Sequence, residues 1–340
     1  MKEKNICKKL SGSYLNDFSH IYIERGVLDH PAAQQIVHKF PDARTVVIDH
    51  YAHIFNRPRQ NSIVQKRSRK LILAKKEVDF IYRGSELCEN FGEENFYYSS
   101  SILNCIYDCD YCYLQGMYTT GNVVMFVNLE DYFAAVDALT EDKKIYLCLS
   151  YDSDLLAFEN ITGFTNRWID YAAGNANLLA EIRTKSANFS AIAHRPIPDN
   201  VILAWTLSPQ AVITQYEFRT PSLEMRLKSI KQAIARGLKV RLSFEPIMMI
   251  EDFERIYGDF MQRVFEDISP EDIRDINMGV FRMSKEHFKR MDKLKGTSRA
   301  FAYPMHCVNG YVSYRQEEKL KQLVTEMVPG AEVKKLLRIQ

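Results

Sequence analysis

Short apolar runs recur along the chain, and their spacing predicts alternating strands and helices. Near the start, residues 20–23 and 45–48 are strand-like, and a helix-like stretch at residues 32–39 separates them. Further along, β-like runs alternate with amphipathic helical stretches. The six strand candidates are residues 95–103, 144–150, 177–184, 200–207, 239–247 and 276–281. This order predicts an α/β fold with a parallel sheet, a partial (β/α)6 barrel of the TIM type.

The helix between the fourth and fifth strand candidates has recognisable ends. A cap residue, a proline and an acid in residues 220–224 precede an amphipathic run, and Gly237 marks its end. Because the next strand candidate starts two residues later, this helix leads directly into residues 239–247. The chain shows no internal repeat and no Gly/Ser-rich linker, so its parts are expected to pack as one body.

The last part of the chain predicts a hairpin and a closing helix. Residues 299–303 and 311–315 alternate aromatic and small side chains around Asn309-Gly310, a strong hairpin signal. Residues 316–328 are helix-like and residues 332–339 are β-like. We therefore predict three segments, listed here in order: an N-terminal α/β extension with a basic segment (1–94), a partial barrel (95–298), and a C-terminal hairpin with a closing helix (299–340).

Composition supports a globular protein with a sizeable core. The chain has 340 residues, of which 46% are hydrophobic. It contains no run of ~20 uninterrupted apolar residues, as a membrane span requires, and its first residues lack the apolar core of a signal peptide. We therefore expect a cytoplasmic protein that does not interact with a membrane.

The positive charge is concentrated in one segment. The formal net charge is +2, but residues 57–76 contain eight Lys or Arg residues and no acid, so the remainder carries −6. Such a run is either a solvated face or a phosphate-binding surface. On the second interpretation, the candidate DNA contacts are Arg57, Arg59, Lys66, Arg67, Arg69 and Lys70.

Three of the seven cysteines lie within eight positions. Cys105, Cys109 and Cys112 have the spacing C-x3-C-x2-C and follow the first barrel strand candidate. Three thiolates on a tight loop can bind three irons of a [4Fe–4S] cluster and leave the fourth iron open to a cofactor. The alternative is a zinc site completed by a distant histidine such as His306, in a nucleic-acid-binding module.

The cysteine loop resembles that of the radical S-adenosylmethionine superfamily. Its extension Cys112-Tyr113-Leu114-Gln115 is similar to the motif of the spore photoproduct lyase family, as are residues 21–24 with Leu28 and Pro31, and residues 314–318. The resemblance covers nearly the whole chain and indicates a divergent, clostridial-type branch. It implies a lyase that repairs the ultraviolet lesion 5-thyminyl-5,6-dihydrothymine in spore DNA with an adenosyl radical.

The resemblance also implies roles for individual residues. Cys148, on the second barrel strand candidate, would donate a hydrogen atom to a thymine radical, which requires a protonated thiol. Tyr111 and Tyr113 would relay hydrogen back to the cofactor. The alternative role of both tyrosines is purely structural, as aromatic side chains that pack around a cluster. The expected contacts of S-adenosylmethionine are Ser150, Lys185, Thr206 and Ser208, although the last two depart from the family's residue types.

The resemblance further implies partners. Because the lesion lies within a duplex, the joined bases must be extruded, and the C-terminal hairpin would flank them, with Arg315 and Tyr314 as candidate contacts. Cys307 is expected to be structural or a second thiol near the lesion. Flavodoxin or ferredoxin is the expected electron donor. The alternative enzyme is a paralogue with the same radical chemistry and another nucleic-acid or nucleotide substrate.

Overall fold

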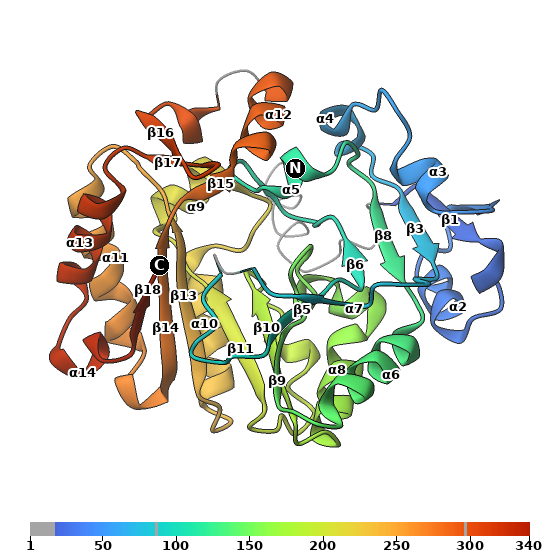
Figure 1. The fold of residues 1–340 in the computed structure, drawn as a ribbon, viewed down its shortest axis with the longest axis horizontal. Coiled ribbons are helices and arrows are strands. Elements are labelled where there is room, and N and C mark those ends of the chain that lie inside the picture. Colours follow the sequence, from blue (N-terminus) through green and yellow to red (C-terminus); the bar gives the residue numbers. More distant parts are fainter. Residues whose placement is uncertain (1–17, 86–87, 296–297) are drawn as a thin grey trace, which may run out of the picture. The chain divides into compact units, whose positions relative to one another are not determined.

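Two largely parallel sheets contain most strands of the computed structural model, which describes residues 18–85, 88–295 and 298–340 (Figure 1). The chain divides into two compact units, each with one of these sheets. Unit 1 contains the described residues up to Asp79, together with Ser101–Asn104 and Tyr118–Glu130. Unit 2 contains Phe80–Ser100, Cys105–Met117 and the described part of Asp131–Gln340.

Unit 1 is built on a five-stranded sheet. In sheet order its strands are β2 (Arg44–Ile48), β1 (His20–Glu24), β3 (Leu71–Ala74), β8 (Val123–Phe126) and β6 (Ile102–Leu103). All neighbours are parallel except β6 and β8. Its helices are α2 (Pro31–His38), α3 (Ala52–Phe55) and α4 (Ser62–Gln65). Strands β3 and β8 are buried throughout, as expected for the centre of a parallel sheet.

Unit 2 is built on an eight-stranded sheet that contains the predicted barrel strands in sequence order. In sheet order its strands are β18 (Leu337–Ile339), β14 (Ile273–Val280), β13 (Val240–Ile247), β11 (Val201–Thr206), β10 (Leu178–Thr184), β9 (Ile145–Cys148), β5 (Phe96–Ser99) and β4 (Ile81–Arg83). Only the β4 and β5 pair is antiparallel. This sheet, with helices in the connections, confirms the predicted α/β fold of the partial-barrel class.

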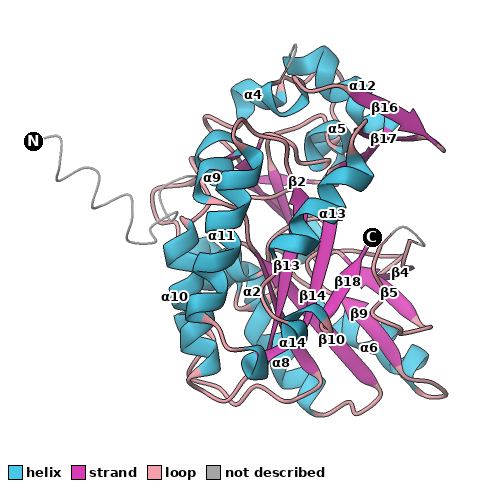
Figure 2. Cartoon of the chain, turned by 90° about the vertical axis from the view of Figure 1, so that its left-hand side faces the viewer, coloured by secondary structure: helices cyan, strands magenta, loops and turns pink. Residues whose placement is uncertain are grey.

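Helices connect these strands and cover the sheet of unit 2 (Figure 2). They are α6 (Leu129–Thr140), α7 (Glu159–Thr162), α8 (Phe164–Ala173), α9 (Gln210–Tyr216), α10 (Leu223–Ile234) and α11 (Phe253–Asp267). In α10, Ser222 is the N-cap and its hydroxyl accepts from the Met225 amide at 3.3 Å, while Gly237 has a φ of +80° beyond the helix. Both ends lie where the sequence predicts them.

The C-terminal hairpin is present, with shorter strands than predicted. It consists of β16 (Met305–Val308) and β17 (Tyr311–Tyr314), and β15 (Arg282–Ser284) pairs with β17 on its other side. Asn309 and Gly310 both have positive φ angles, +50° and +83°, as a type I′ turn requires. The first residues of the predicted arm, Arg299–Phe301, form a 3-10 helix capped by Ser298 instead. Helices α12 (Lys285–Lys295), α13 (Glu317–Met327) and α14 (Ala331–Lys334) complete this region.

Two strand predictions need correction. The candidate at residues 95–103 is two strands, β5 and β6, which belong to the sheets of different units. The β-like tail at residues 332–339 begins as α14, where Glu332 pairs with Lys335 at 2.7 Å, and only its end is β18. Each candidate joins two elements across a short polar break, at residues 99–101 in the first case and 334–335 in the second.

No helix among the described residues is long and apolar enough to cross a membrane. The division into three segments at residues 94/95 and 298/299 stays a prediction, and the structure divides the chain into the two units given above.

Candidate active site

The cysteines of the predicted cluster lie on one loop of unit 2. Cys109 is buried in β7 (Asp108–Cys109), which pairs with β12 (Glu217–Phe218), and Cys105 and Cys112 are partly buried on either side. The Cys112 amide donates to the Cys109 carbonyl at 3.1 Å, so the second and third cysteines share one tight turn. Helix α5 (Leu114–Met117) follows at once. The predicted spacing therefore does place three thiols on one compact loop.

The three thiols of the loop lie close together. Over residues 18–85, 88–295 and 298–340, no three His, Cys, Asp or Glu side chains surround a site for one metal ion. Cys105 and Cys112 nevertheless lie near enough to influence the pKa of Cys109, which burial raises and Lys185 lowers. In a [4Fe–4S] cluster each iron takes one cysteine, so the three sulfurs stand farther apart than the ligands of one zinc ion. The donor set fits such a cluster.

A buried carboxylate adjoins this loop. Glu217 lies opposite Cys109 in the β7–β12 pair and accepts the hydroxyl of Tyr111. It also accepts the Ser208 hydroxyl at 3.0 Å and forms a fully buried ion pair with Arg226. Burial raises the pKa of Glu217, but Arg226 and then Lys185 outweigh it and lower the pKa to about 2. The carboxylate is therefore ionised beside the cysteine loop.

Lys185 lies at the carboxyl end of β10, facing the cysteine loop. Its ammonium group is 5.7 Å from the centre of the Tyr111 ring, and Asp154 accepts its backbone amide at 2.7 Å. Burial lowers the pKa of Lys185, but Glu217 and Cys109 more than offset this and raise it, so the side chain is a cation. A cation here can bind the carboxylate of a cofactor. Arg226, which donates to the Thr206 carbonyl at 3.0 Å, belongs to the same network.

Ser150 offers a polar contact at the end of β9. Its hydroxyl oxygen is buried and has no hydrogen-bond partner within the described part of the chain. A buried hydroxyl without a partner is costly unless a ligand or water satisfies it. Ser150 therefore fits the predicted contact with S-adenosylmethionine.

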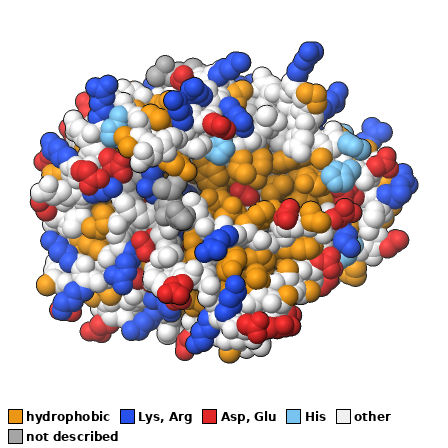
Figure 3. Space-filling model, in the orientation of Figure 1, with side chains coloured by type: hydrophobic (Ala, Val, Ile, Leu, Met, Phe, Trp, Pro, Cys, Tyr) orange, Lys and Arg blue, Asp and Glu red, His pale blue; other side chains and the backbone are white. Residues whose placement is uncertain are grey.

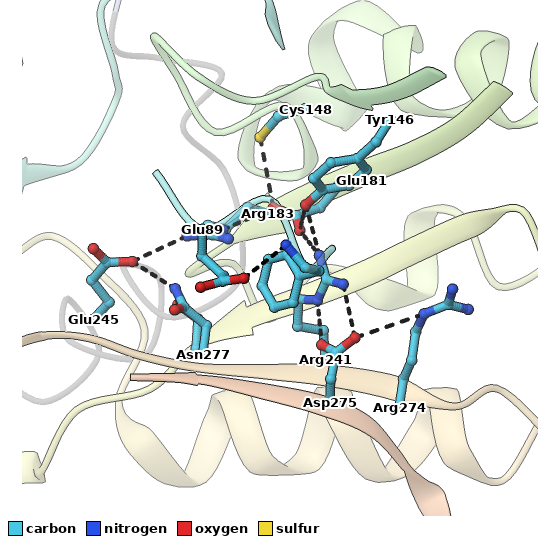
Figure 4. A network of polar contacts seen from close by, with 12 residues as sticks. Glu89, Tyr146, Cys148, Glu181, Arg183, Arg241, Glu245, Arg274, Asp275 and Asn277 are labelled. Carbon is cyan, nitrogen blue, oxygen red and sulfur yellow. Dashed lines mark hydrogen bonds and ion pairs between the residues drawn. The ribbon is translucent and has the colours of Figure 1, made fainter. Parts of the chain in front are cut away.

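Cys148 is the last residue of β9 and has a buried side chain. Its thiol lies 3.6 Å from an oxygen of Glu181 on the neighbouring strand β10 (Figure 4). Burial, followed by the negative charge of Glu181, raises the pKa of the Cys148 thiol well above its usual range. The thiol is therefore protonated at neutral pH, as a hydrogen-atom donor must be.

The two tyrosines of the loop have different surroundings. Tyr111 belongs to the Glu217 network described above. Tyr113 donates its hydroxyl to the Tyr151 carbonyl at 2.6 Å, and the two rings lie 6.0 Å apart. Tyr151 stacks on Tyr98 with 4.1 Å between ring centres and is hydrogen-bonded to the thiol of Cys88.

Cys88 is a thiol near Cys148 that the sequence analysis missed. It packs against the apolar cluster that contains Cys148, and burial followed by the charge of Glu245 raises its pKa. Cys307, the second thiol considered from the sequence, is exposed on β16. Cys88 lies in a polar stretch with no motif, so only the fold could place it there.

The candidate DNA contacts differ in exposure. Arg57, Arg59 and Arg67 are exposed in unit 1, and Lys66 and Lys70 are partly exposed. Arg69 is buried, with 3% of its surface exposed, and is withdrawn as a phosphate contact. In unit 2, Arg315 is exposed, whereas Tyr314 is buried and donates its hydroxyl to the Ala300 carbonyl at 2.9 Å, so it is withdrawn too. A local charge or aromatic pattern does not indicate which of its members faces solvent.

The charge on the visible face is mixed. Figure 3 shows Lys and Arg side chains interspersed with Asp and Glu rather than gathered in one continuous field. This agrees with a net charge of only +2. A net charge so close to zero argues against tight, sequence-independent binding to DNA.

A largely parallel sheet with helical connections and a three-cysteine loop that follows β5 and β6 is typical of a radical S-adenosylmethionine enzyme. The chain belongs to the spore photoproduct lyase family, whose model matches residues 17–309. A spore photoproduct lyase of Clostridium acetobutylicum is 22% identical over 269 residues, which are 76% of this chain and 77% of the relative. The predicted family is therefore confirmed.

Solved structures of spore photoproduct lyases share this fold. One variant has a TM-score of 0.80 at 17% identity, covering 95% of this chain and 99% of that one. Another, which has bound AdoMet and a dinucleoside spore photoproduct, has a TM-score of 0.79 at 17% identity with the same coverage. The predicted fold class is confirmed by this similarity.

Proposed function

We propose that this chain repairs the spore photoproduct, 5-thyminyl-5,6-dihydrothymine, in DNA to two thymines by a radical mechanism. Membership of the spore photoproduct lyase family supports the substrate. The observation that carries the proposal is the buried thiol of Cys148 at the carboxyl end of β9, where burial raises its pKa. Catalytic side chains of barrel enzymes come from this end of the strands.

The cofactors of the proposed reaction are a [4Fe–4S] cluster and S-adenosylmethionine. Bound together, they supply a 5′-deoxyadenosyl radical able to take hydrogen from an unactivated carbon. Cys105, Cys109 and Cys112 would bind the cluster. The residues that would bind S-adenosylmethionine are Ser150, Lys185, Thr206 and Ser208. The ammonium group of Lys185 would pair with the methionyl carboxylate, and the hydroxyl of Ser150 would gain a hydrogen-bond partner that the described residues do not provide.

Cys148 would return a hydrogen atom to the thymine radical left by cleavage of the methylene bridge. Its S–H bond breaks while a C–H bond forms on the thymine, and the cysteine is left as a thiyl radical. Tyr111 and Tyr113 are the proposed relay back to the cofactor. Tyr113 has a connection toward Cys148 through Tyr151 and Cys88, whereas the hydroxyl of Tyr111 is directed to Glu217.

The proposed partners are ultraviolet-damaged DNA and an electron donor such as flavodoxin or ferredoxin. The exposed cations Arg57, Arg59, Arg67 and Arg315 are the proposed phosphate contacts, with Lys66 and Lys70 as partly exposed additions. A reducing compartment, as in the cytoplasm, would keep the cluster thiols available.

The test is an anaerobic assay of the full chain reconstituted with iron and sulfide. It contains S-adenosylmethionine, dithionite and a dinucleotide with the spore lesion, and thymine products are followed by chromatography. We expect intact thymine product from the wild type, and from Cys148→Ala continued cofactor cleavage with little intact product. Cleavage of the cofactor by the wild type without any repair would refute the proposed substrate and favour the paralogue.

A further inference from the structure

Glu181 lies directly beside Cys148 in the sheet. The two residues are paired in register on the neighbouring parallel strands β10 and β9, and one Glu181 oxygen accepts the Cys148 thiol at 3.6 Å. The Glu181 side chain has no exposed surface. A buried carboxylate in the middle of a parallel strand is costly unless charged partners surround it, so its place beside a thiol calls for an explanation.

Two arginines and a tyrosine fix this carboxylate (Figure 4). Arg183 donates to the same oxygen as the thiol, at 2.8 Å. The other oxygen accepts from Arg241 and, at 2.5 Å, from the Tyr146 hydroxyl. Burial raises the pKa of Glu181, but Arg183 and Arg241 outweigh it and lower the pKa to about 2.

We propose that Glu181, fixed between Arg183 and Arg241, is a positioning residue that orients the Cys148 S–H group and keeps its hydrogen on sulfur. The inference rests on the proposed role of Cys148 as hydrogen donor. Glu181 gains no proton in that step, because the hydrogen leaves sulfur together with one electron and forms the C–H bond of thymine. A thiolate would have no hydrogen atom to give.

Titratable and charged groups from several elements surround this thiol. Glu181 and Arg183 face it from β10, and Tyr146 from its own strand β9. Tyr98 of β5 and Cys88 pack against its cluster. Among the charged groups, Glu181 opposes the thiolate and Arg183 favours it. Without the Glu181 charge, the arginine would stabilise the thiolate.

The first test follows alkylation of Cys148 by iodoacetamide between pH 6 and 10, read by mass spectrometry on anaerobically reconstituted protein. It needs neither cofactor turnover nor lesion, so it stands even if the proposed function fails. Glu181→Gln should alkylate at least tenfold faster at pH 8 and should reach half its limiting rate at lower pH. Each pKa unit changes the thiolate fraction about tenfold.

Glu245→Gln is the matched control. Glu245 pairs with Arg183 at 3.4 Å and accepts a hydrogen bond from Asn277 at 2.6 Å. The hydrogen bond of the Cys148 thiol goes to Glu181 and not to Glu245. Glu181→Asp, which keeps the negative charge, should alkylate more slowly than Glu181→Gln but faster than the wild type. Equal acceleration by both amide variants would contradict the proposal, since general loosening of the network would then explain the effect. A wild-type thiol that titrates near its ordinary pKa would overturn it without any variant.

The second test uses repair itself. The fraction of intact thymine product formed by the wild type should stay flat from pH 6 to 9, whereas in Glu181→Gln it should fall as pH rises. Cleavage of S-adenosylmethionine in the same reactions is the internal control. A product fraction that does not change with pH in Glu181→Gln would contradict the positioning role. Absence of thymine product from the wild type would contradict only the proposed function.

Discussion

Glu217 is paired with Cys109 across the two-stranded sheet of β7 and β12, so a buried carboxylate is fixed to the strand that holds the middle cysteine. The same carboxylate forms the buried ion pair with Arg226. The geometry of the cysteine loop therefore depends on a charge pair outside the cysteine motif.

Glu217→Gln should destabilise the protein strongly. Removing one partner of a buried ion pair costs about 3–5 kcal/mol, because the other charge is left uncompensated. We also expect less iron per chain after reconstitution, because β12 supports the loop. Urea unfolding and iron analysis measure the two effects. Glu224→Gln, which breaks only a surface pair with Arg263, should leave both nearly unchanged. Wild-type stability in Glu217→Gln would contradict this account.

Acid should remove the contribution of the Glu181 carboxylate to the free energy of unfolding. Its pKa is about 2 in the folded state, below its ordinary value of 4.5. A lowered pKa stabilises the fold fully above about pH 4.5, and that contribution is lost as pH falls toward 2. The difference in unfolding free energy between wild type and Glu181→Gln should therefore be constant from pH 7 to 5. It should then shrink by about 3 kcal/mol toward pH 2.

Urea unfolding of cluster-free protein at a series of pH values measures this difference, because acid destroys iron–sulfur clusters. The surface variant Glu224→Gln supplies the baseline for a carboxylate outside any buried network. A gap between wild type and Glu181→Gln that widens below pH 4.5 would show that the sign of the linkage is wrong.

The sequence predicts those parts of the structure that depend on residues close together in the chain. Short apolar runs located the barrel strands, although the first candidate is two strands, and Asn309-Gly310 located the hairpin turn, because backbone geometry at these positions follows from neighbouring residues. The cysteine loop was found for the same reason, since its three thiols lie within eight positions.

The charge networks could not be predicted, because their members come from distant parts of the chain. Tyr111 and Glu217 are 106 residues apart, and Tyr146 and Arg241 are 95 apart. One signal was available: Glu181 and Arg183 interrupt the apolar run of their strand candidate, and a carboxylate buried within a parallel strand needs a further charged partner from another strand. The identity of that partner depends on the strand order, which one sequence does not give.

Iron content separates cluster ligands from other cysteines. Cys109→Ala should lose nearly all cluster iron after anaerobic reconstitution, because a cubane with only two protein thiolates is poorly retained. Cys307→Ala is the matched control, because Cys307 is exposed on β16 and should bind no iron. Absorbance near 400 nm with iron and sulfide assays provides the measurement. Similar iron loss in both variants would refute the assignment of the cluster to the loop.

Gly116 is the position in α5 where any side chain would disturb the cysteine loop. A Cβ atom there would lie 2.4 Å from the carbonyl oxygen of His287 in α12, so one of the two helices must move. Gly116→Ala should cost about 1–3 kcal/mol of stability, as overpacking does, and should also reduce cluster content. Gly258, in the middle of α11, has open space at its Cβ position, so Gly258→Ala should stabilise by up to about 1 kcal/mol. Urea unfolding measures the stability of both variants. If Gly116→Ala does not change the free energy of unfolding, the packing of α5 against α12 does not depend on this close approach.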